Sequence, residues 1–151
     1  MRSININDLH SHKGTELGTS EWMSIGQDRI NQFAEATNDH QWIHVDTERA
    51  ARELPTKSTI AHGFLSLSLI APMSMEIWEI TGADKLLNYG FNKVRFLNMV
   101  PVDSKLRLHM KIADVETLKN GGIKIALEAT MEIEGQSKPA FISEFIMVAF
   151  A

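Results

Sequence analysis

A carboxylate and an imidazole lie close together in the segment Thr37–His44, where Asp39 is followed by His44 five positions later. Further along, Ala61–Phe64 carries a glycine and opens a long apolar segment. A carboxylate and an imidazole can transfer a proton together, and backbone N–H groups at the start of a helix can stabilise a developing negative charge. These residue types in this order favour an enzyme.

Asp39 and His44 can act together only across a turn. On an ideal helix, residues five positions apart point roughly 140° away from each other. Thr37, Asn38 and Asp39 all compete for backbone hydrogen bonds, which favours the end of a helix at this point. Across such a turn both side chains can bind one water molecule. The sequence leaves open that Asp39 only closes the turn and that His44 is a structural histidine.

A metal site is a weaker interpretation of the same segment. His40 and His44 have the i, i+4 spacing of paired zinc ligands, with Asp39 or Asp46 as a third ligand. That spacing needs a continuous helix, and the helix breakers before His40 oppose one. No metal is expected.

The apolar segment also contains three serines, Ser66, Ser68 and Ser74. None stands in the G-x-S-x-G pattern of a serine nucleophile. We expect them to be packing residues whose hydroxyls bond back to helix carbonyls.

Gly63 and His62 stand at the expected start of this helix. The first turns of a helix present N–H groups without an internal partner, together with the positive end of the dipole, and can hold an oxyanion. Glycine at this position is also explained by close packing alone. His62 can pack, cap or shape the same entrance.

Three helices should position these residues. A capping box from Ser24 to Gln27 starts the first, Asp46 caps the second, and the third is apolar around most of its circumference, so that the rest of the fold should wrap it. The predicted ranges are Ile25–Ala36, Thr47–Glu53 and His62–Ile80.

After the helices the hydrophobic period changes to two. Alternating residues run through Leu106–Ile112 and Ile123–Ile133, with glycine-containing turns between the runs. Phe141–Phe150 is apolar on both faces, which indicates a central strand or a subunit contact. Helices followed by an antiparallel meander predict an α+β architecture in which a sheet covers one apolar helix.

Composition limits the class of protein. The 151 residues suit one domain spanning 1–151, with 1–20 as an N-terminal arm or edge segment. A net charge of −4 argues against a nucleic-acid binder. The absence of cysteine fits the cytoplasm, and the polar N-terminus shows no secretion signal. The apolar run Ile60–Ile80 carries a proline and two glutamates, so membrane insertion is not expected.

These motifs together resemble the MaoC-like, (R)-specific enoyl-CoA hydratase family of hotdog proteins, and the later segments resemble its NodN-type branch. The residues that carry the resemblance are Phe33-Ala34-x2-Thr37, Asp39-x4-His44, Ala61-His62-Gly63, Asn88–Phe96 and Val100-Pro101-Val102. The family pattern Gly-Asp-x-Asn-Pro-aliphatic-His has Asn38, Gln41 and Trp42 in place of its glycine, asparagine and proline.

The resemblance implies a hotdog fold and a reversible syn hydration of trans-2-enoyl thioesters to (R)-3-hydroxyacyl thioesters. Asp39 and His44 would activate the water, and the N–H of Gly63 would polarise the thioester carbonyl. It also implies an edge-to-edge homodimer and no cofactor, since coenzyme A is part of an acyl-CoA substrate. The candidates for further substrate contacts are His62, Lys93, Arg95, Lys105 and Arg107. The last four would contact the phosphates of the ligand, although an ordinary solvated strand face is the better explanation of each one taken singly.

Two other functions are compatible with the sequence. Hotdog proteins also hydrolyse thioesters, so an acyl-CoA thioesterase is an alternative. A non-catalytic subunit that binds acyl thioesters is another, although such a subunit has no chemical reason to keep both Asp39 and His44.

Overall fold

The computed structural model describes residues 1–151, and helices and strands follow one another in an α+β order. The elements in chain order are β1 (Arg2–Asn5), a 3-10 helix (Ile6–His12), β2 (Glu16–Thr19), β3 (Met23–Ile25), α1 (Gln27–Thr37), α2 (Trp42–Val45), α3 (Thr47–Glu53), α4 (Gly63–Ser68), α5 (Ile70–Ile77), β4 (Trp78–Thr81), β5 (Lys85–Phe96), β6 (Ser104–Thr117), β7 (Ile123–Ile133) and β8 (Phe141–Phe150). None of the helices is long and apolar enough to cross a bilayer.

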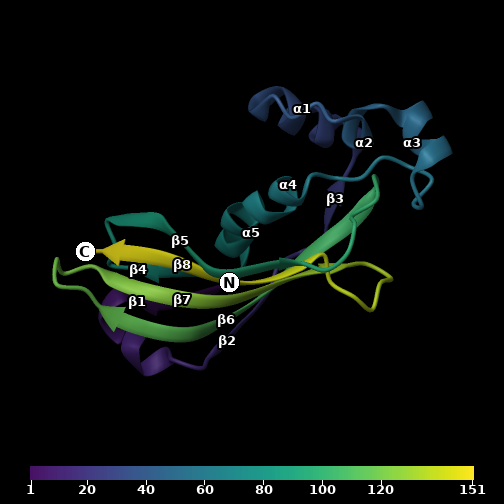
Figure 1. The fold of residues 1–151 in the computed structure, drawn as a ribbon. Helices are drawn as coiled ribbons and strands as arrows, with labels where there is room; N and C mark the ends of the chain where they lie inside the picture. Colours follow the sequence, from purple (N-terminus) through teal and green to yellow (C-terminus); the bar gives the residue numbers. More distant parts are fainter.

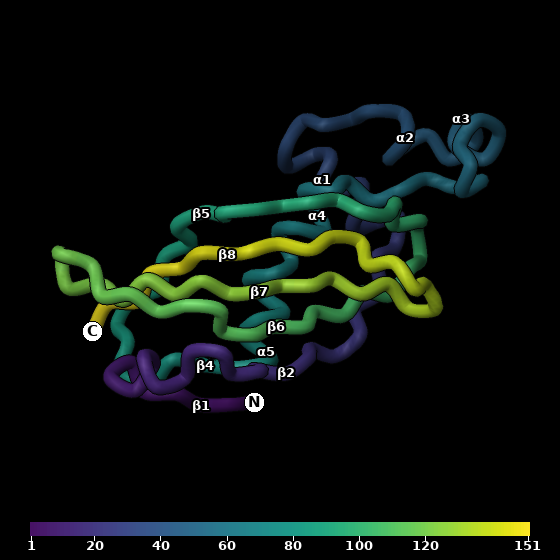
Figure 2. The backbone as a smooth tube through the Cα atoms, turned by 60° about the horizontal axis from the view of Figure 1, so that its bottom comes forward, coloured from purple at the N-terminus to yellow at the C-terminus, as the bar shows by residue number.

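The main sheet is antiparallel, with strand order β2-β6-β7-β8-β5. Strand β3 pairs with the first residues of β6, on the same edge of the sheet as β2. Figure 2 shows these strands side by side, with α5 behind them. The predicted meander of β6, β7 and β8 is confirmed. Strand β8 lies between β7 and β5, which explains why it is apolar on both faces.

Helices α4 and α5 lie across one face of the sheet, and α1 to α3 form a lobe at one end of it (Figure 1). Ile70, Met73 and Ile77 on α5 are buried, at helical spacing, in the core that the sheet covers. This confirms the predicted hotdog arrangement. The prediction that the rest of the fold wraps the apolar helix holds for one side only. On the side away from the sheet, Phe64 and Met75 are each 69% exposed.

The predicted single helix His62–Ile80 is wrong in two respects. It is broken at Leu69, because Pro72 has no N–H to donate to the carbonyl four residues earlier. It also ends at Ile77, because Trp78–Thr81 leaves it to form β4, which pairs in parallel with β1. The N-terminal segment, expected to be an arm or edge, thus supplies β1 and also β2, a strand at the edge of the main sheet.

The predicted capping box at Ser24 is also wrong. Ser24 lies in β3, opposite Lys105 on β6, and Ile25 is fully buried. Helix α1 therefore begins two residues later, at Gln27, after an N-cap glycine without a side-chain hydrogen bond. Strand pairing at this point outweighs the local capping signal. The cap predicted at Asp46 is confirmed, since its Oδ1 accepts from the N–H of Arg49 at 2.9 Å.

Candidate active site

The turn after α1 has a backbone that fits this sequence. Asn38 ends the helix in the left-handed region, with φ 60°, a conformation that asparagine tolerates better than most residues. Trp42 is the first residue of α2, the position where a proline is favoured. Asn38 and Trp42 therefore occupy the positions at which the family pattern has glycine and proline, and the turn forms with them in place.

Asp39 is held in this turn by backbone contacts. Its Oδ1 accepts from the N–H of Gln41 at 3.3 Å, and its own N–H donates to Thr37 Oγ1 at 3.4 Å. The residue itself is exposed. Asp39 does close the turn, as the structural interpretation expected, and one of its oxygens stays free for another partner.

His44 is 6% exposed, and its ring orientation is fixed. Its Nδ1 lies 2.7 Å from the carbonyl oxygen of Ile60. A carbonyl only accepts, so Nδ1 carries the proton and Nε2 presents a lone pair in the neutral ring. The carbonyl of His44 accepts from Gln27 Nε2 at 2.8 Å, and the other end of that amide accepts from Thr59 at 2.5 Å.

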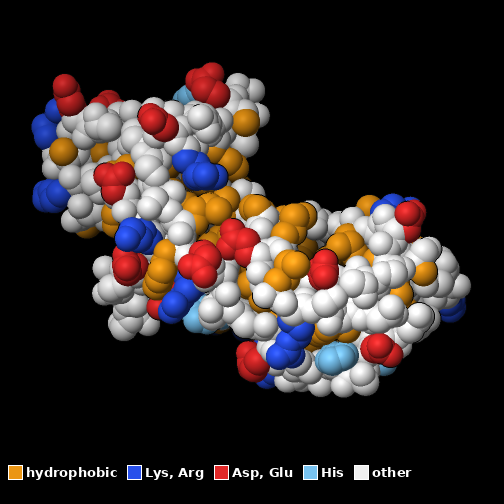
Figure 3. Space-filling model, turned by 180° about the vertical axis from the view of Figure 1, so that it is seen from behind, with side chains coloured by type: hydrophobic (Ala, Val, Ile, Leu, Met, Phe, Trp, Pro, Cys, Tyr) orange, Lys and Arg blue, Asp and Glu red, His pale blue; other side chains and the backbone are white.

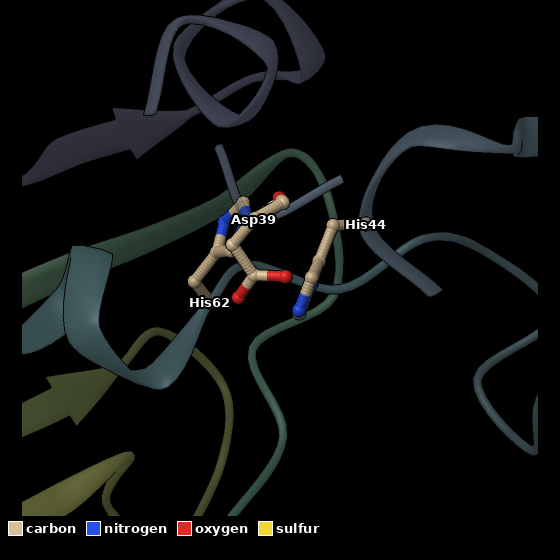
Figure 4. Close-up of side chains that lie close together, drawn as sticks. All are labelled: Asp39, His44 and His62. Carbon is tan, nitrogen blue, oxygen red and sulfur yellow. Dashed lines mark hydrogen bonds between the residues drawn. The ribbon is translucent and has the colours of Figure 1, made fainter. Parts of the chain in front are cut away.

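The turn brings Asp39, His44 and His62 together. One carboxylate oxygen and one ring nitrogen from each histidine all lie within 4.8 Å of one another. Figure 4 shows the carboxylate of Asp39 facing the ring of His44, with His62 beside both. The rings of His44 and His62 are stacked, with centroids 3.8 Å apart and planes inclined by 23°.

The surroundings of His44 lower the pKa of its imidazole. Burial is the largest cause, and the ring of His62 acts in the same direction, whereas the hydrogen bond to Ile60 and the charge of Asp39 raise the pKa. His44 is therefore neutral at pH 7, and its Nε2 can act as a base.

The same three side chains are the strongest candidates for a metal site, but their orientation does not suit one. One nitrogen of each ring is bonded to a backbone carbonyl, so His62 could offer an ion only Nδ1, which is buried and not among the cleft-lining groups. His40, the ligand that spacing suggested, points instead to Glu35, with 3.6 Å between Nε2 and Oε1. The arrangement is better suited to proton transfer.

A cleft of about 410 Å³ opens beside the imidazole of His44. Gly63, at the start of α4, and Phe96, at the end of β5, form part of its wall. A Cβ atom on Gly63 would lie 3.0 Å from Cε1 of Phe96, closer than side chains normally approach. Glycine therefore lets Phe96 lie against the start of the helix, and a side chain here would displace the Phe96 ring by a few tenths of an ångström.

Residues 8–133 match the family of the MaoC like domain. The chain belongs to the MaoC-like dehydratase family. It is 44% identical to the 3-hydroxyacyl-thioester dehydratase Z of Mycobacterium tuberculosis H37Rv, covering 94% of this chain and 93% of that protein. It is 40% identical to nodulation protein N of Rhizobium meliloti, covering 99% and 93%.

Solved structures support the fold of this MaoC-like protein. The unliganded (R)-hydratase PhaJ1 of Pseudomonas aeruginosa superposes with a TM-score of 0.68 at 23% identity, covering 91% of this chain and 81% of that one. The hotdog fold is therefore established both by the observed sheet and by similarity.

Lys93 and Arg95, two candidates for substrate contacts, do not line the cleft of this MaoC-like protein. On β5, Phe96 faces the helices, and Lys93 faces the other side of the sheet, where it lines a groove with Glu128 and Glu144. Arg95 alternates with Phe96 and so shares the side of Lys93. The structure does not bring Lys93 and Arg95 to the dyad of their own chain.

The other two basic candidates are engaged in ion pairs along the outer face of the sheet. Arg107 lies 2.9 Å from Glu132, and Lys105 lies 3.7 Å from Glu134. An ordinary strand face accounts for both contacts, and a role of Lys105 or Arg107 in substrate binding stays a prediction.

The expectation for the three serines holds for two of them. Ser68 and Ser74 donate to carbonyls one helical turn earlier, at 2.7 and 2.8 Å. Ser66, which lines the cleft, is 2% exposed, and its hydroxyl has no hydrogen-bond partner within the chain. The prediction that Ser66 bonds back to its helix is wrong.

Replacing Ser66 by alanine should leave the protein as stable or raise its free energy of unfolding by about 1 kcal/mol, since a buried unpaired hydroxyl is removed. Ser68→Ala is the matched control, because it removes a hydroxyl that is bonded within the same helix. Thermal unfolding of both variants checks this. A clear loss of stability in Ser66→Ala, larger than that in Ser68→Ala, would show that the hydroxyl is paired in solution.

Sequence reasoning missed three contacts that shape the site. Gln27 ties the start of α1 to the carbonyl of His44, the carbonyl of Ile60 fixes the His44 ring, and Phe96 lies over Gly63. Gln27 was considered only as part of a capping box. The contacts of Gln27 with His44 and Thr59 depend on tertiary structure, and no local pattern signals them.

Proposed function

We propose that this protein hydrates trans-2-enoyl thioesters to (R)-3-hydroxyacyl thioesters, reversibly and with coenzyme A thioesters as substrates. The observation that carries the proposal is the convergence of the Asp39 carboxylate and the His44 imidazole beside the cleft that contains Gly63. The reaction named for the mycobacterial relative, 3-hydroxyacyl-thioester dehydration, is the reverse of this hydration.

The separation of Asp39 and His44 suits a shared water molecule. Their nearest ligand atoms lie within 4.8 Å, and no direct hydrogen bond joins the two side chains. One oxygen atom can lie within hydrogen-bond distance, about 2.8 Å, of both groups. In hydration this water adds its oxygen to C3 of the enoyl group and loses a proton to the dyad. A proton is returned to C2 on the same face, so one water is consumed for each double bond.

Gly63 supplies the electrostatic part of the mechanism. As the first residue of α4, its N–H has no acceptor within the helix. Directed at the thioester carbonyl, this N–H would stabilise the enolate that forms when oxygen adds at C3. The reaction requires no metal or redox cofactor, and coenzyme A enters and leaves as part of the substrate.

The test is the loss of the enoyl-thioester absorbance when the purified protein is mixed with crotonyl-CoA and with longer trans-2-enoyl-CoA substrates. We expect hydration, and chiral analysis of the product should give the (R)-3-hydroxyacyl thioester. The (S) product, or no reaction at any chain length, would contradict the proposal. Release of free coenzyme A without hydration would instead favour the thioesterase.

We expect the dyad to lose activity at acid pH, because its imidazole must be neutral. Burial holds the pKa of His44 below its ordinary value near 6.5. The midpoint of the fall in kcat/KM should therefore lie below pH 6.5. The unfolded chain binds the proton at higher pH than the folded one, so stability also decreases as pH falls from the unfolded to the folded pKa of His44. Circular dichroism at each pH separates the two effects, and a midpoint above 6.5 would contradict the assignment.

We also propose that β5 pairs with a second copy of this chain, and the exposed apolar surface supports this. Strand β5 is at the edge of the sheet, and an apolar edge strand is unusual in a monomer. Figure 3 shows apolar side chains gathered across the middle of one face, beside the helical lobe. The large exposed apolar residues on β5 and its neighbours are Phe64, Met75, Leu86, Leu87, Tyr89, Phe91, Phe96 and Met99.

Light scattering should give twice the chain mass of 17.0 kDa for the wild type. Leu87→Glu, which places a charge on the exposed apolar edge strand, should shift the protein toward the monomer. Lys119→Glu, in the hairpin between β6 and β7, is the control and should remain dimeric. A wild type that stays monomeric at high micromolar concentration would rule out the dimer.

A further inference from the structure

His62 is in contact with both members of the proposed dyad. Its Nε2 lies 3.0 Å from the backbone carbonyl oxygen of Asp39, and its ring stacks on the ring of His44. Phe33 of α1 packs against the ring of His62, with centroids 4.8 Å apart. His62 is 2% exposed, so its ring is enclosed by the protein.

We infer that His62 is a positioning residue, which fixes Asp39 and His44 relative to one another through its N–H donor and its stacked ring. This inference deepens the proposed function and rests on it for the role of the dyad. His62 precedes the helix that carries Gly63, so one side chain links the turn of Asp39, the ring of His44 and the start of α4. It is not among the residues that line the cleft, and it therefore acts through the dyad and not on substrate.

The hydrogen bond also determines which nitrogen of His62 is a donor. A carbonyl only accepts, so Nε2 carries a proton, and Nδ1 is buried without a partner. Nε2 is therefore engaged with the turn of Asp39, and the ring is not among the residues that line the cleft. This geometry suits a positioning role better than the role of a second base.

The two contacts can be separated by substitution. His62→Phe keeps a flat ring for stacking and removes the donor to Asp39. His62→Gln keeps an amide N–H near the place of Nε2 and removes the ring. Because a displacement of about 1 Å at a reacting group can cost about 100-fold in rate, we expect each variant to lower kcat for crotonyl-CoA hydration by about 10- to 100-fold. KM should change little, since the cleft keeps its lining.

Matched controls distinguish positioning from general damage. His109→Phe makes the same change on the outer face of the sheet, where His109 bonds Glu132, and should keep the wild-type kcat. Phe33→Leu removes the ring behind His62 without touching the dyad and should give a smaller loss. This variant also keeps the inference testable if both His62 variants fail to fold.

A second readout does not depend on activity. The nitrogen chemical shifts of His44, followed by NMR against pH without substrate, report the tautomer and the pKa of its ring. Titratable groups that act on this ring are Asp39 and His62. His62→Phe should change the titration of His44, and His109→Phe should not. If the wild type hydrates nothing, the proposed function fails, while the NMR titration still tests the role of His62. Folded His62 variants with wild-type kcat, or with an unchanged His44 titration, would overturn the inference.

Discussion

Replacing Asp39 by asparagine or His44 by alanine is expected to lower kcat/KM for crotonyl-CoA hydration by about 10²- to 10⁴-fold, the usual contribution of general acid–base catalysis. In Asp39→Asn the amide would keep an oxygen for the N–H of Gln41, so the turn should persist while the carboxylate charge is lost. His44→Ala removes Nε2, the nitrogen that the carbonyl of Ile60 leaves with a free lone pair, from the ring that lines the cleft. Initial rates of enoyl absorbance loss measure both effects.

His40→Ala is the matched control for these two variants. His40 lies between the dyad residues in sequence, but its ring is exposed and faces Glu35. It should therefore keep the wild-type rate. The double variant of Asp39 and His44 should be little worse than the poorer single variant, because groups that act on one water fail as a unit. Losses that multiply would show that the two residues act on separate steps.

Local patterns predicted the elements that local interactions decide. The Asp46 cap and the alternation in β6 and β7 each depend on residues close in sequence, and both were correct. The cap predicted at Ser24 was wrong because β3 pairs with β6 at this point. The predicted end of the helix at Ile80 was wrong because Trp78–Thr81 pairs with β1, far away in the sequence. Tertiary pairing outweighed helix propensity in both cases.

The face on which Lys93 and Arg95 lie could not be read from alternation. Strand β5 shifts register against β8 twice, between Asn88 and Gly90 and between Phe91 and Lys93. Each shift of one residue reverses which side chains face the helices. The spacing of basic and apolar residues in this strand is therefore no guide to its two faces.

The sequence predicted which residue types form the site and that a turn brings them together. Helix breakers at Thr37 to Asp39 indicated how Asp39 and His44 could converge, and the structure brings them together. The tautomer of His44 depends on the carbonyl of Ile60, and the stacking of His62 depends on where α4 begins. Such orientations are set by packing between segments distant in the sequence, so local sequence patterns do not predict them.

Gly63→Pro should lower kcat by about 10²- to 10³-fold relative to Gly63→Ala, which is the effect of removing one oxyanion donor. Proline lacks an N–H and is well tolerated at the first position of a helix. The preceding His62 has φ −59° and ψ 137°, the extended conformation that residues before proline prefer. The helix should therefore persist in the variant, and circular dichroism can verify this.

Alanine is the necessary comparison, because both substitutions add a Cβ atom 3.0 Å from the ring of Phe96. Gly63→Ala keeps the N–H, so any loss it shows measures the displacement of Phe96 alone. The ratio of the two kcat values then measures the contribution of the Gly63 N–H to catalysis. Equal rates for the two variants would place the oxyanion contact elsewhere, while leaving the acid–base role of Asp39 and His44 intact.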